Sequence, residues 1–180
     1  MVLSTSGCLV VSLNPAYDDE SMGWDQGLVG SWADEDDNAS MVIERDEWKS
    51  YRVHYVHPIE SGDLTAYLTA IGDERFLDLM PARGQDRGSF VVPVHAILKV
   101  RLDGDRLELT QLSYDWFRDR LKRGEAIQGL DAVLDQKDNA LIVAPTARLR
   151  AWLRGSSGPA FGASAVFARK GGAAAAATGS

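Results

Sequence analysis

Alternation of apolar and polar residues, repeated in many short segments, is the feature that most constrains how this chain folds. Residues 40–44, 51–55, 64–70 and 161–167 all show it. A period of two buries one face of a segment and leaves the other face to water, which is typical of antiparallel strands. The longest case sets Val94, Ala96, Leu98, Val100 and Leu102 against His95, Lys99 and Arg101.

Turn residues divide these segments into consecutive hairpins. Asp103-Gly104 separates two apolar stretches, and Asp-Gly supplies the positive φ that a tight hairpin turn needs. Reversals are also predicted at Ser61-Gly62-Asp63, at Gly72-Asp73-Glu74 and at Arg45-Asp46-Glu47. A meander of many strands tends to close on itself because closure removes its exposed edges. We therefore predict a mainly β chain whose antiparallel meander closes into a barrel.

Two short helices are predicted in the C-terminal half. The first covers about Tyr114–Arg123, with Ser113 as its N-cap and Gly124 just past its end. The second begins at Pro145-Thr146, ends at Gly155 and follows a strand at residues 140–143. A closing strand is predicted over residues 161–169.

A chain of 180 residues is the size of one domain. We expect an N-terminal arm over residues 1–20, a barrel domain over residues 21–170 and a disordered tail over residues 171–180, where glycine and alanine dominate.

The stretch Leu28-Val29-Gly30-Ser31-Trp32 at the head of the meander resembles the lipocalins and their wider calycin relatives. The resemblance implies a calycin-like barrel in which Gly30 lets the first strand bend and Trp32 plugs the barrel base. It also implies that a basic residue of the last strand stacks on the indole, and Arg169 stands at that place in the sequence.

The chain also resembles a family of small bacterial lipoproteins of uncharacterised function. The resemblance rests on Gly7-Cys8 with the residues up to Pro15, on Gly30-Ser31-Trp32, on residues 102–105 and 114–116, and on Pro145-Thr146-Ala147. It implies lipid attachment at Cys8 and a place in the bacterial cell envelope. Against this, Thr5 stands where such signals usually have Leu, and only Met1-Val2-Leu3 precede the small residues. Without lipidation, Cys8 is a plain thiol and the expected location is cytoplasmic.

The net charge of −7 argues against a nucleic-acid partner, because phosphate binding needs clustered Lys and Arg. The basic residues are scattered along most of the chain. We expect contact with a membrane only through a lipid anchor on Cys8.

No catalytic or metal-binding motif stands out. His54 and His57 are three residues apart, a spacing that places them on opposite faces of a strand. A nucleophile elbow, a metal-binding helix motif and a phosphate-cradling glycine loop are all missing from the sequence. We therefore expect no enzyme activity, no metal and no cofactor.

Two functional hypotheses remain. Tyr51, Val53, Tyr55 and His57 share one face of a predicted strand and are candidates for lining a pocket inside the barrel. The chain would then be a lipid-anchored envelope protein that holds or chaperones a small apolar or amphipathic ligand. Alternatively the same side chains fill the barrel, as they do in most small barrels. The chain would then be a structural or interaction protein without a ligand.

Overall fold

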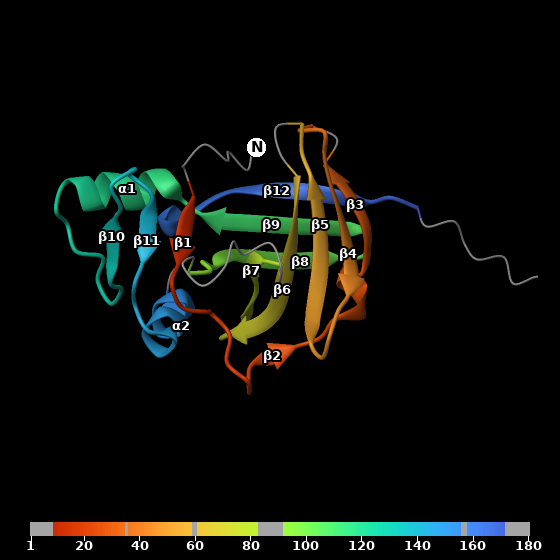
Figure 1. Cartoon of the computed structure of the whole chain (residues 1–180), viewed down its shortest axis with the longest axis horizontal. Helices are drawn as coiled ribbons and strands as arrows, with labels where there is room; N and C mark the ends of the chain where they lie inside the picture. The colour runs from red at the N-terminus through yellow and green to blue at the C-terminus, as the bar shows by residue number, and fades with distance from the viewer. Residues whose placement is uncertain (1–8, 35, 59–60, 83–91, 156–157, 172–180) are drawn as a thin grey trace, which may run out of the picture.

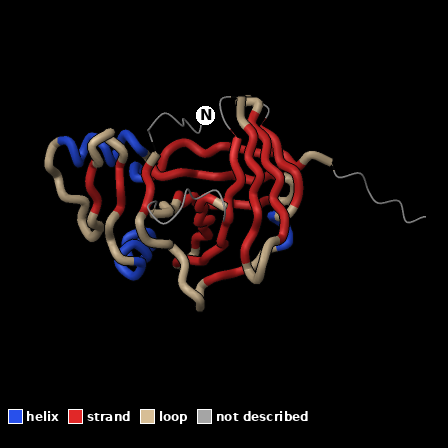
Figure 2. The backbone as a smooth tube through the Cα atoms, viewed as in Figure 1, coloured by secondary structure: helices blue, strands red, loops and turns tan. Residues whose placement is uncertain are grey.

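In the computed structural model, the chain forms a closed antiparallel β-barrel with a smaller lobe of strands and helices against one side (Figure 1). The structure describes residues 9–34, 36–58, 61–82, 92–155 and 158–171. Figure 2 separates the two parts by secondary structure: the barrel is built of strands, whereas most of the helix lies in the lobe.

Eight strands make the barrel, and each pairs with its neighbour in an antiparallel register. From β3 to β9 every strand pairs with the next one in the chain, and β12 closes the ring by pairing with both β9 and β3. The strands are β3 (Gly30–Asp34), β4 (Ala39–Arg45), β5 (Ser50–Val56), β6 (Ser61–Ile71), β7 (Glu74–Pro81), β8 (Ala96–Asp103), β9 (Arg106–Leu112) and β12 (Phe161–Arg169).

The predicted fold class is confirmed, and so are most of the predicted turns. Asp103 pairs with Arg106 across a two-residue turn, in which Gly104 has a φ of 58°. The reversal predicted at residues 61–63 is wrong, because these residues belong to β6. Gly62 lies opposite Tyr55 in the β5–β6 ladder, and a Cβ built on it would meet nothing within 4 Å.

The lobe carries a second sheet, in which β11 (Ala140–Ile142) lies between β1 (Val10–Ser12) and β10 (Ala132–Leu134). β1 is parallel to β11, so part of the expected N-terminal arm is a regular strand. The strand predicted at 140–143 exists but lies outside the barrel sheet. Short elements complete the structure: β2 (Met22–Gly23) on β6, and single 3₁₀ turns at Gln26–Leu28 and Gly158–Ala160.

Both predicted helices are present. Helix α1 covers Tyr114–Lys122, and its N-cap is Ser113, whose hydroxyl oxygen accepts from the Trp116 N–H. Helix α2 covers Thr146–Gly155. Phe117 of α1 and Leu149 of α2 are buried in one apolar cluster with Phe76 and Ile97 of the barrel's outer face. This cluster fixes the lobe against the barrel wall.

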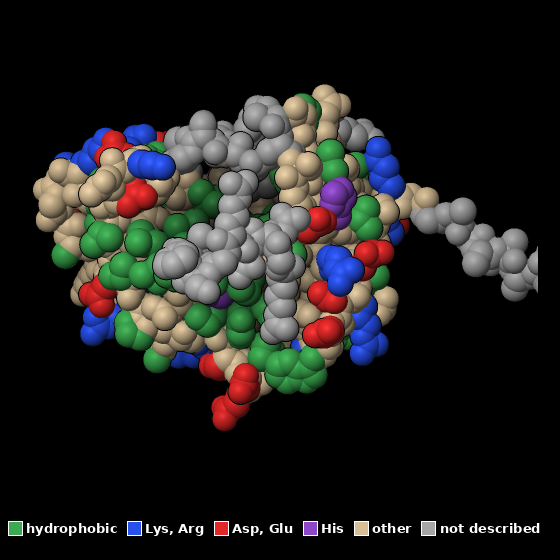
Figure 3. Space-filling view, viewed as in Figure 1, with side chains coloured by type: hydrophobic (Ala, Val, Ile, Leu, Met, Phe, Trp, Pro, Cys, Tyr) green, Lys and Arg blue, Asp and Glu red, His purple; other side chains and the backbone are tan. Residues whose placement is uncertain are grey.

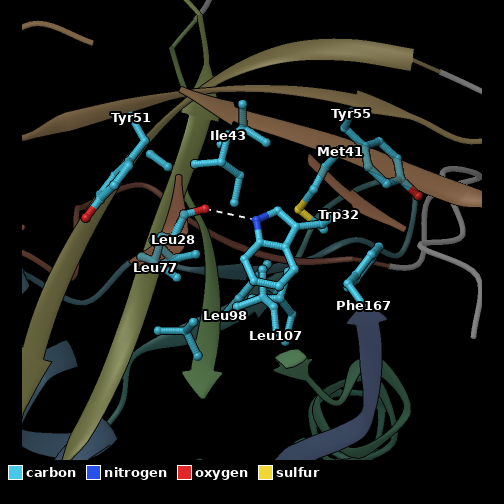
Figure 4. Close-up of a cluster of buried hydrophobic side chains, with 14 of the residues drawn as sticks. Leu28, Trp32, Met41, Ile43, Tyr51, Tyr55, Leu77, Leu98, Leu107 and Phe167 are labelled. Atoms are coloured by element: carbon cyan, nitrogen blue, oxygen red, sulfur yellow. Dashed lines mark hydrogen bonds between the residues drawn. The ribbon is translucent and has the colours of Figure 1, made fainter. Parts of the chain in front are cut away.

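Side chains from all eight barrel strands fill the barrel interior. Figure 4 shows Trp32 at the centre, with Met41 and Ile43 beside it and Leu98 and Leu107 below it. The buried cluster consists of Leu28, Trp32, Ala39, Met41, Ile43, Tyr51, Val53, Tyr55, Ala66, Leu68, Leu77, Leu98, Val100, Leu107, Leu109 and Phe167. Eight strands enclose a space that side chains can fill or that can hold one small ligand, and here one contiguous cluster of buried side chains occupies it.

The Arg169 guanidinium lies over the Trp32 ring at the end of the barrel where β3 begins, which we call the base. The Trp32 side chain is 1% exposed, and its indole N–H donates to the Leu28 carbonyl over 2.9 Å. The guanidinium carbon of Arg169 lies 4.2 Å from the centroid of the Trp32 ring. The same guanidinium donates to the carbonyls of Val29 and Gly27, at 2.9 and 2.7 Å, and to Asp105 at 2.9 Å. One side chain thus joins β12 to the segment that leads into β3.

Gly30 makes room for this arrangement. Its φ is 145°, and a Cβ built on it would lie 2.5 Å from the Arg169 Nη1. We predict that Gly30→Ala lowers the free energy of unfolding by about 1–3 kcal/mol, because it adds backbone strain and displaces the guanidinium. Chemical denaturation measures the change. Gly62→Ala is the matched control: a Cβ there meets nothing within 4 Å, so its effect stays below about 1 kcal/mol. Equal losses in the two variants would contradict this account of Gly30.

Candidate functional site

The four residues expected to line an internal pocket face the barrel interior or its rim, and all four are buried. The Tyr51 ring lies toward the base, where it stacks on Trp24 with the ring centroids 4.3 Å apart. Its hydroxyl accepts from the Asp25 backbone N–H over 2.7 Å. Burial raises the pKa of the Tyr51 phenol. Tyr51 therefore packs the closed end of the barrel, and Val53 belongs to the same core.

Tyr55 and His57 lie toward the other end of the barrel. Their rings are nearly parallel, with centroids 6.4 Å apart, and each residue is 8% exposed. Figure 4 shows Tyr51 and Tyr55 on opposite sides of Trp32, with the Tyr55 hydroxyl directed away from the indole. The predicted lining residues are therefore spread along the barrel, from Tyr51 near the base to His57 toward the other end. A pocket formed by all four stays a prediction.

Three surface cavities lined by described residues lie outside the barrel core. One, of about 510 Å³, lies over β7 to β9 and has mostly charged walls, including Arg75, Lys99 and Glu108. A second, of about 710 Å³, lies in the lobe and has mostly aliphatic walls, including Leu130 and Val133. Neither has an aromatic lining residue. Both therefore lack the combination of flat apolar rings and convergent polar groups that is typical of small-ligand sites.

The third cavity, which we call the outer groove, has both kinds of group. It measures about 800 Å³ and follows the outer face of β5, β6 and β7 from the β4–β5 turn to the end of β7. Its lining residues are Tyr17, Asp46, Glu47, Trp48, Ser50, Arg52, Asp63, Thr65, Tyr67, Met80, Pro81 and Ala82. It is therefore the best candidate for a functional site.

Trp48 stands exposed in the β4–β5 turn, at one end of the outer groove. It is 63% exposed, although a large apolar ring gains most free energy when it is buried. Its φ of 55° places it in the left-handed region, which a bulky residue rarely adopts. Residues held in such conformations concentrate at functional sites. Both observations point to a role for the ring that core packing does not explain.

Tyr17 and Tyr67 provide the aromatic surface in the middle of the groove. Their ring centroids are 4.4 Å apart. Burial, together with the nearby Tyr67, Asp78 and Asp19, raises the pKa of Tyr17 to about 12. The Tyr17 phenol therefore stays protonated at neutral pH, and its hydroxyl can donate a hydrogen bond.

A buried Asp–His pair beneath these rings holds Tyr17 in place. The Asp78 carboxylate accepts from the Ala16 backbone N–H over 2.6 Å, and its second oxygen lies 2.6 Å from His95 Nδ1. Asp78 and His95 are both buried. Arg150 of α2 secures the same segment by donating to the Ala16 carbonyl over 2.6 Å. The N-terminal segment is thus tied to both the barrel wall and the lobe.

Charged side chains complete the groove. Arg52 donates to Asp46 over 3.1 Å, and His54 Nδ1, on the same strand, lies 2.7 Å from Asp63. Both pairs are largely exposed, so solvent screens them and a ligand can compete for them. Figure 3 shows a mixed charged region over β4 and β5, where acidic side chains, basic side chains and a histidine lie close together.

The outer groove is not visible in the sequence pattern. Its aromatic residues come from the N-terminal segment, from a turn and from β6, so nothing in the local pattern brings them together. One signal was present: Arg52 and Thr65 are the outward-facing residues of the alternating segments, opposite in phase to Tyr51 and Ala66. These alternate positions mark the outer wall on which the groove lies.

Cys8 and residues 172–180 lie outside the described residues, so lipid attachment and tail disorder stay predictions. Within the described ranges, no three His, Cys, Asp or Glu side chains come together as metal ligands would, and no helix is long and apolar enough to cross a bilayer. His54 is exposed on the outer wall, whereas His57 is buried.

Comparisons with protein-family models, with curated proteins and with solved structures found no match to this chain. The geometry of the outer groove is therefore the main guide to function.

The Asp78–His95 pair is predicted to be essential for positioning the N-terminal segment. Asp78→Ala leaves the Ala16 N–H and the His95 ring without their acceptor inside the protein, so we expect a loss of about 3 kcal/mol in the free energy of unfolding. Glu74→Ala is the control, because its pair with Lys99 is exposed and contributes less than about 1 kcal/mol. Urea denaturation of both variants measures the difference. If Asp78→Ala is no more costly than Glu74→Ala, the proposed anchoring is wrong.

Proposed function

We propose that this protein is a small-molecule binding protein and that its ligand occupies the outer groove instead of the barrel interior. The ligand is amphipathic, because aromatic rings and charged groups line the same cavity. The observation that carries the proposal is Trp48, which lies at one end of a cavity of about 800 Å³. Its indole is exposed, and its backbone is strained in the left-handed region.

The packed interior supports this location. A ligand inside the barrel would have to displace buried side chains around Trp32, and core packing resists that because each displaced group loses its contacts. The outer groove requires no such rearrangement. Its volume lies within the range of about 300–1,000 Å³ that is usual for small-ligand pockets.

A fragment screen followed by NMR tests the proposal. Isotope-labelled protein is titrated with a library of small fragments, and the backbone amide shifts are mapped onto the structure. We expect binders to shift resonances of Trp48, Arg52 and Tyr67 and to leave those of Leu98 and Leu107 in the core unchanged. A screen in which no fragment shifts the groove resonances would refute the proposed function.

Two variants sharpen this test. Trp48→Gly removes the indole at a position whose φ suits glycine, so the fold should be retained while the affinity of groove binders falls. Val133→Ala trims an exposed side chain in the lobe cavity and should leave their affinity unchanged. Equal affinities for the parent and Trp48→Gly would exclude Trp48 from the site.

The packed interior also favours a second candidate, an interaction protein whose barrel holds no ligand. In that case the lobe cavity around Leu130 and Val133 would be the surface that docks on a protein partner. The same screen separates the two functions, because this candidate predicts no ligand in the outer groove.

A further inference from the structure

Negative charge outweighs positive charge along the outer groove. Among the described residues, its lining includes the carboxylates of Asp46, Glu47 and Asp63 but one guanidinium, that of Arg52. Arg52 is already paired with Asp46. The whole chain adds to this field with its net charge of −7. A cleft of one sign raises the local concentration of ligands of the opposite sign, so the groove favours cations over anions.

The aromatic groups favour the same kind of ligand. The face of an indole or phenol ring attracts a cation, and Trp is the strongest of the aromatic side chains in this respect. The chain itself gives an example, since the Lys49 ammonium lies 5.6 Å from the centroid of the Trp48 ring. That ammonium is held in place by donating to the Met22 carbonyl over 2.9 Å. The exposed part of the Trp48 ring remains accessible to a ligand.

The middle of the groove offers both apolar and polar contacts. Met80 and the Tyr17–Tyr67 pair supply apolar surface. Thr65 lies beside them, opposite Arg52 in the β5–β6 ladder. Asp63 lies farther along the same strand, opposite His54. A ligand with a positive charge and an apolar body can therefore contact a ring while the carboxylates of the groove attract its charge.

We propose that the ligand of the outer groove is an organic cation, an amine or quaternary ammonium compound that combines a positive charge with an apolar body. This inference rests on the proposed function, because it assigns a chemical class to the ligand of the same site. A simple anion or a neutral apolar molecule would lack the charge attraction to the groove carboxylates.

The test compares choline with 3,3-dimethylbutan-1-ol, which has nearly the same shape without the charge. Both are titrated into the full chain, and affinities are measured from amide shifts of the groove residues. We expect choline to bind about tenfold more tightly, since a cation–π contact together with a carboxylate contributes on this scale. Raising the salt concentration should weaken choline binding and leave the alcohol unaffected.

Asp63→Asn supplies the matched variant. It removes one carboxylate charge and keeps the side chain's shape, so choline affinity should fall about threefold or more while the affinity for the alcohol stays unchanged. Asp138→Asn makes the same change in net charge in the lobe, at a residue with a φ of 64° that asparagine tolerates, and should alter neither affinity.

The outcomes distinguish the class of ligand from the function. The organic-cation assignment is wrong if the alcohol binds the groove as tightly as choline. It is also wrong if screened neutral or anionic fragments bind there and choline does not. In both cases the proposed small-molecule binding is retained. If neither choline nor any fragment shifts the groove resonances, both proposals fail.

Discussion

The contact between Arg169 and Trp32 holds the first and last barrel strands in one closed ring. Closure requires β12 to pair with β3, yet their ladder is short and joins Ala168 to Ala33 and Arg169 to Trp32. Arg169 adds the stack on the indole and the hydrogen bonds to the carbonyls of Gly27 and Val29. These bonds satisfy backbone acceptors beside the 3₁₀ turn that covers the base. The arrangement depends on Gly30, because any larger residue would occupy the position of the guanidinium.

Because side chains fill the barrel, we place the proposed ligand site on its outer wall. Trp32 and the other interior side chains occupy the core, so the proposed ligand needs a surface that carries both rings and charges. The outer groove meets this need because the N-terminal segment crosses β6 and β7 and places Tyr17 beside Tyr67. Asp78 and Arg150 fix that segment from below and from the lobe. The lobe thus contributes to the site indirectly, by holding one of its walls.

Much of the barrel could be predicted from the sequence because its signals are local. Alternation located residues 40–44, 51–55 and 161–169 in strands, and the Asp103-Gly104 turn set a hairpin register. The strand Val10–Ser12 could not be predicted, because it pairs with Ala140–Ile142, far along the chain, and lacks a turn that would reveal its partner. The reversal predicted at Ser61–Asp63 was wrong for a local reason: Gly62 is typical of a turn, but here it is a ladder residue opposite Tyr55.

The candidate site was less predictable than the fold. Tyr51 and Tyr55 were expected to face the barrel interior because they lie on one face of a strand, but the Trp24 ring that stacks on Tyr51 comes from another segment and only the structure shows it. Trp48 gave no signal either, since its residue type does not reveal a left-handed conformation. The outer groove combines residues from separate elements, so it becomes visible only when the N-terminal segment is placed on the barrel.

The claim that the barrel core is solid can be tested directly by a crystal structure determined under xenon pressure. Xenon enters dry apolar cavities of a size that packed interiors lack. The account predicts that no xenon atom occupies the space among Trp32, Met41, Tyr55, Leu98 and Phe167. A well-occupied xenon atom inside that ring of side chains would contradict it and would return the ligand to the barrel interior.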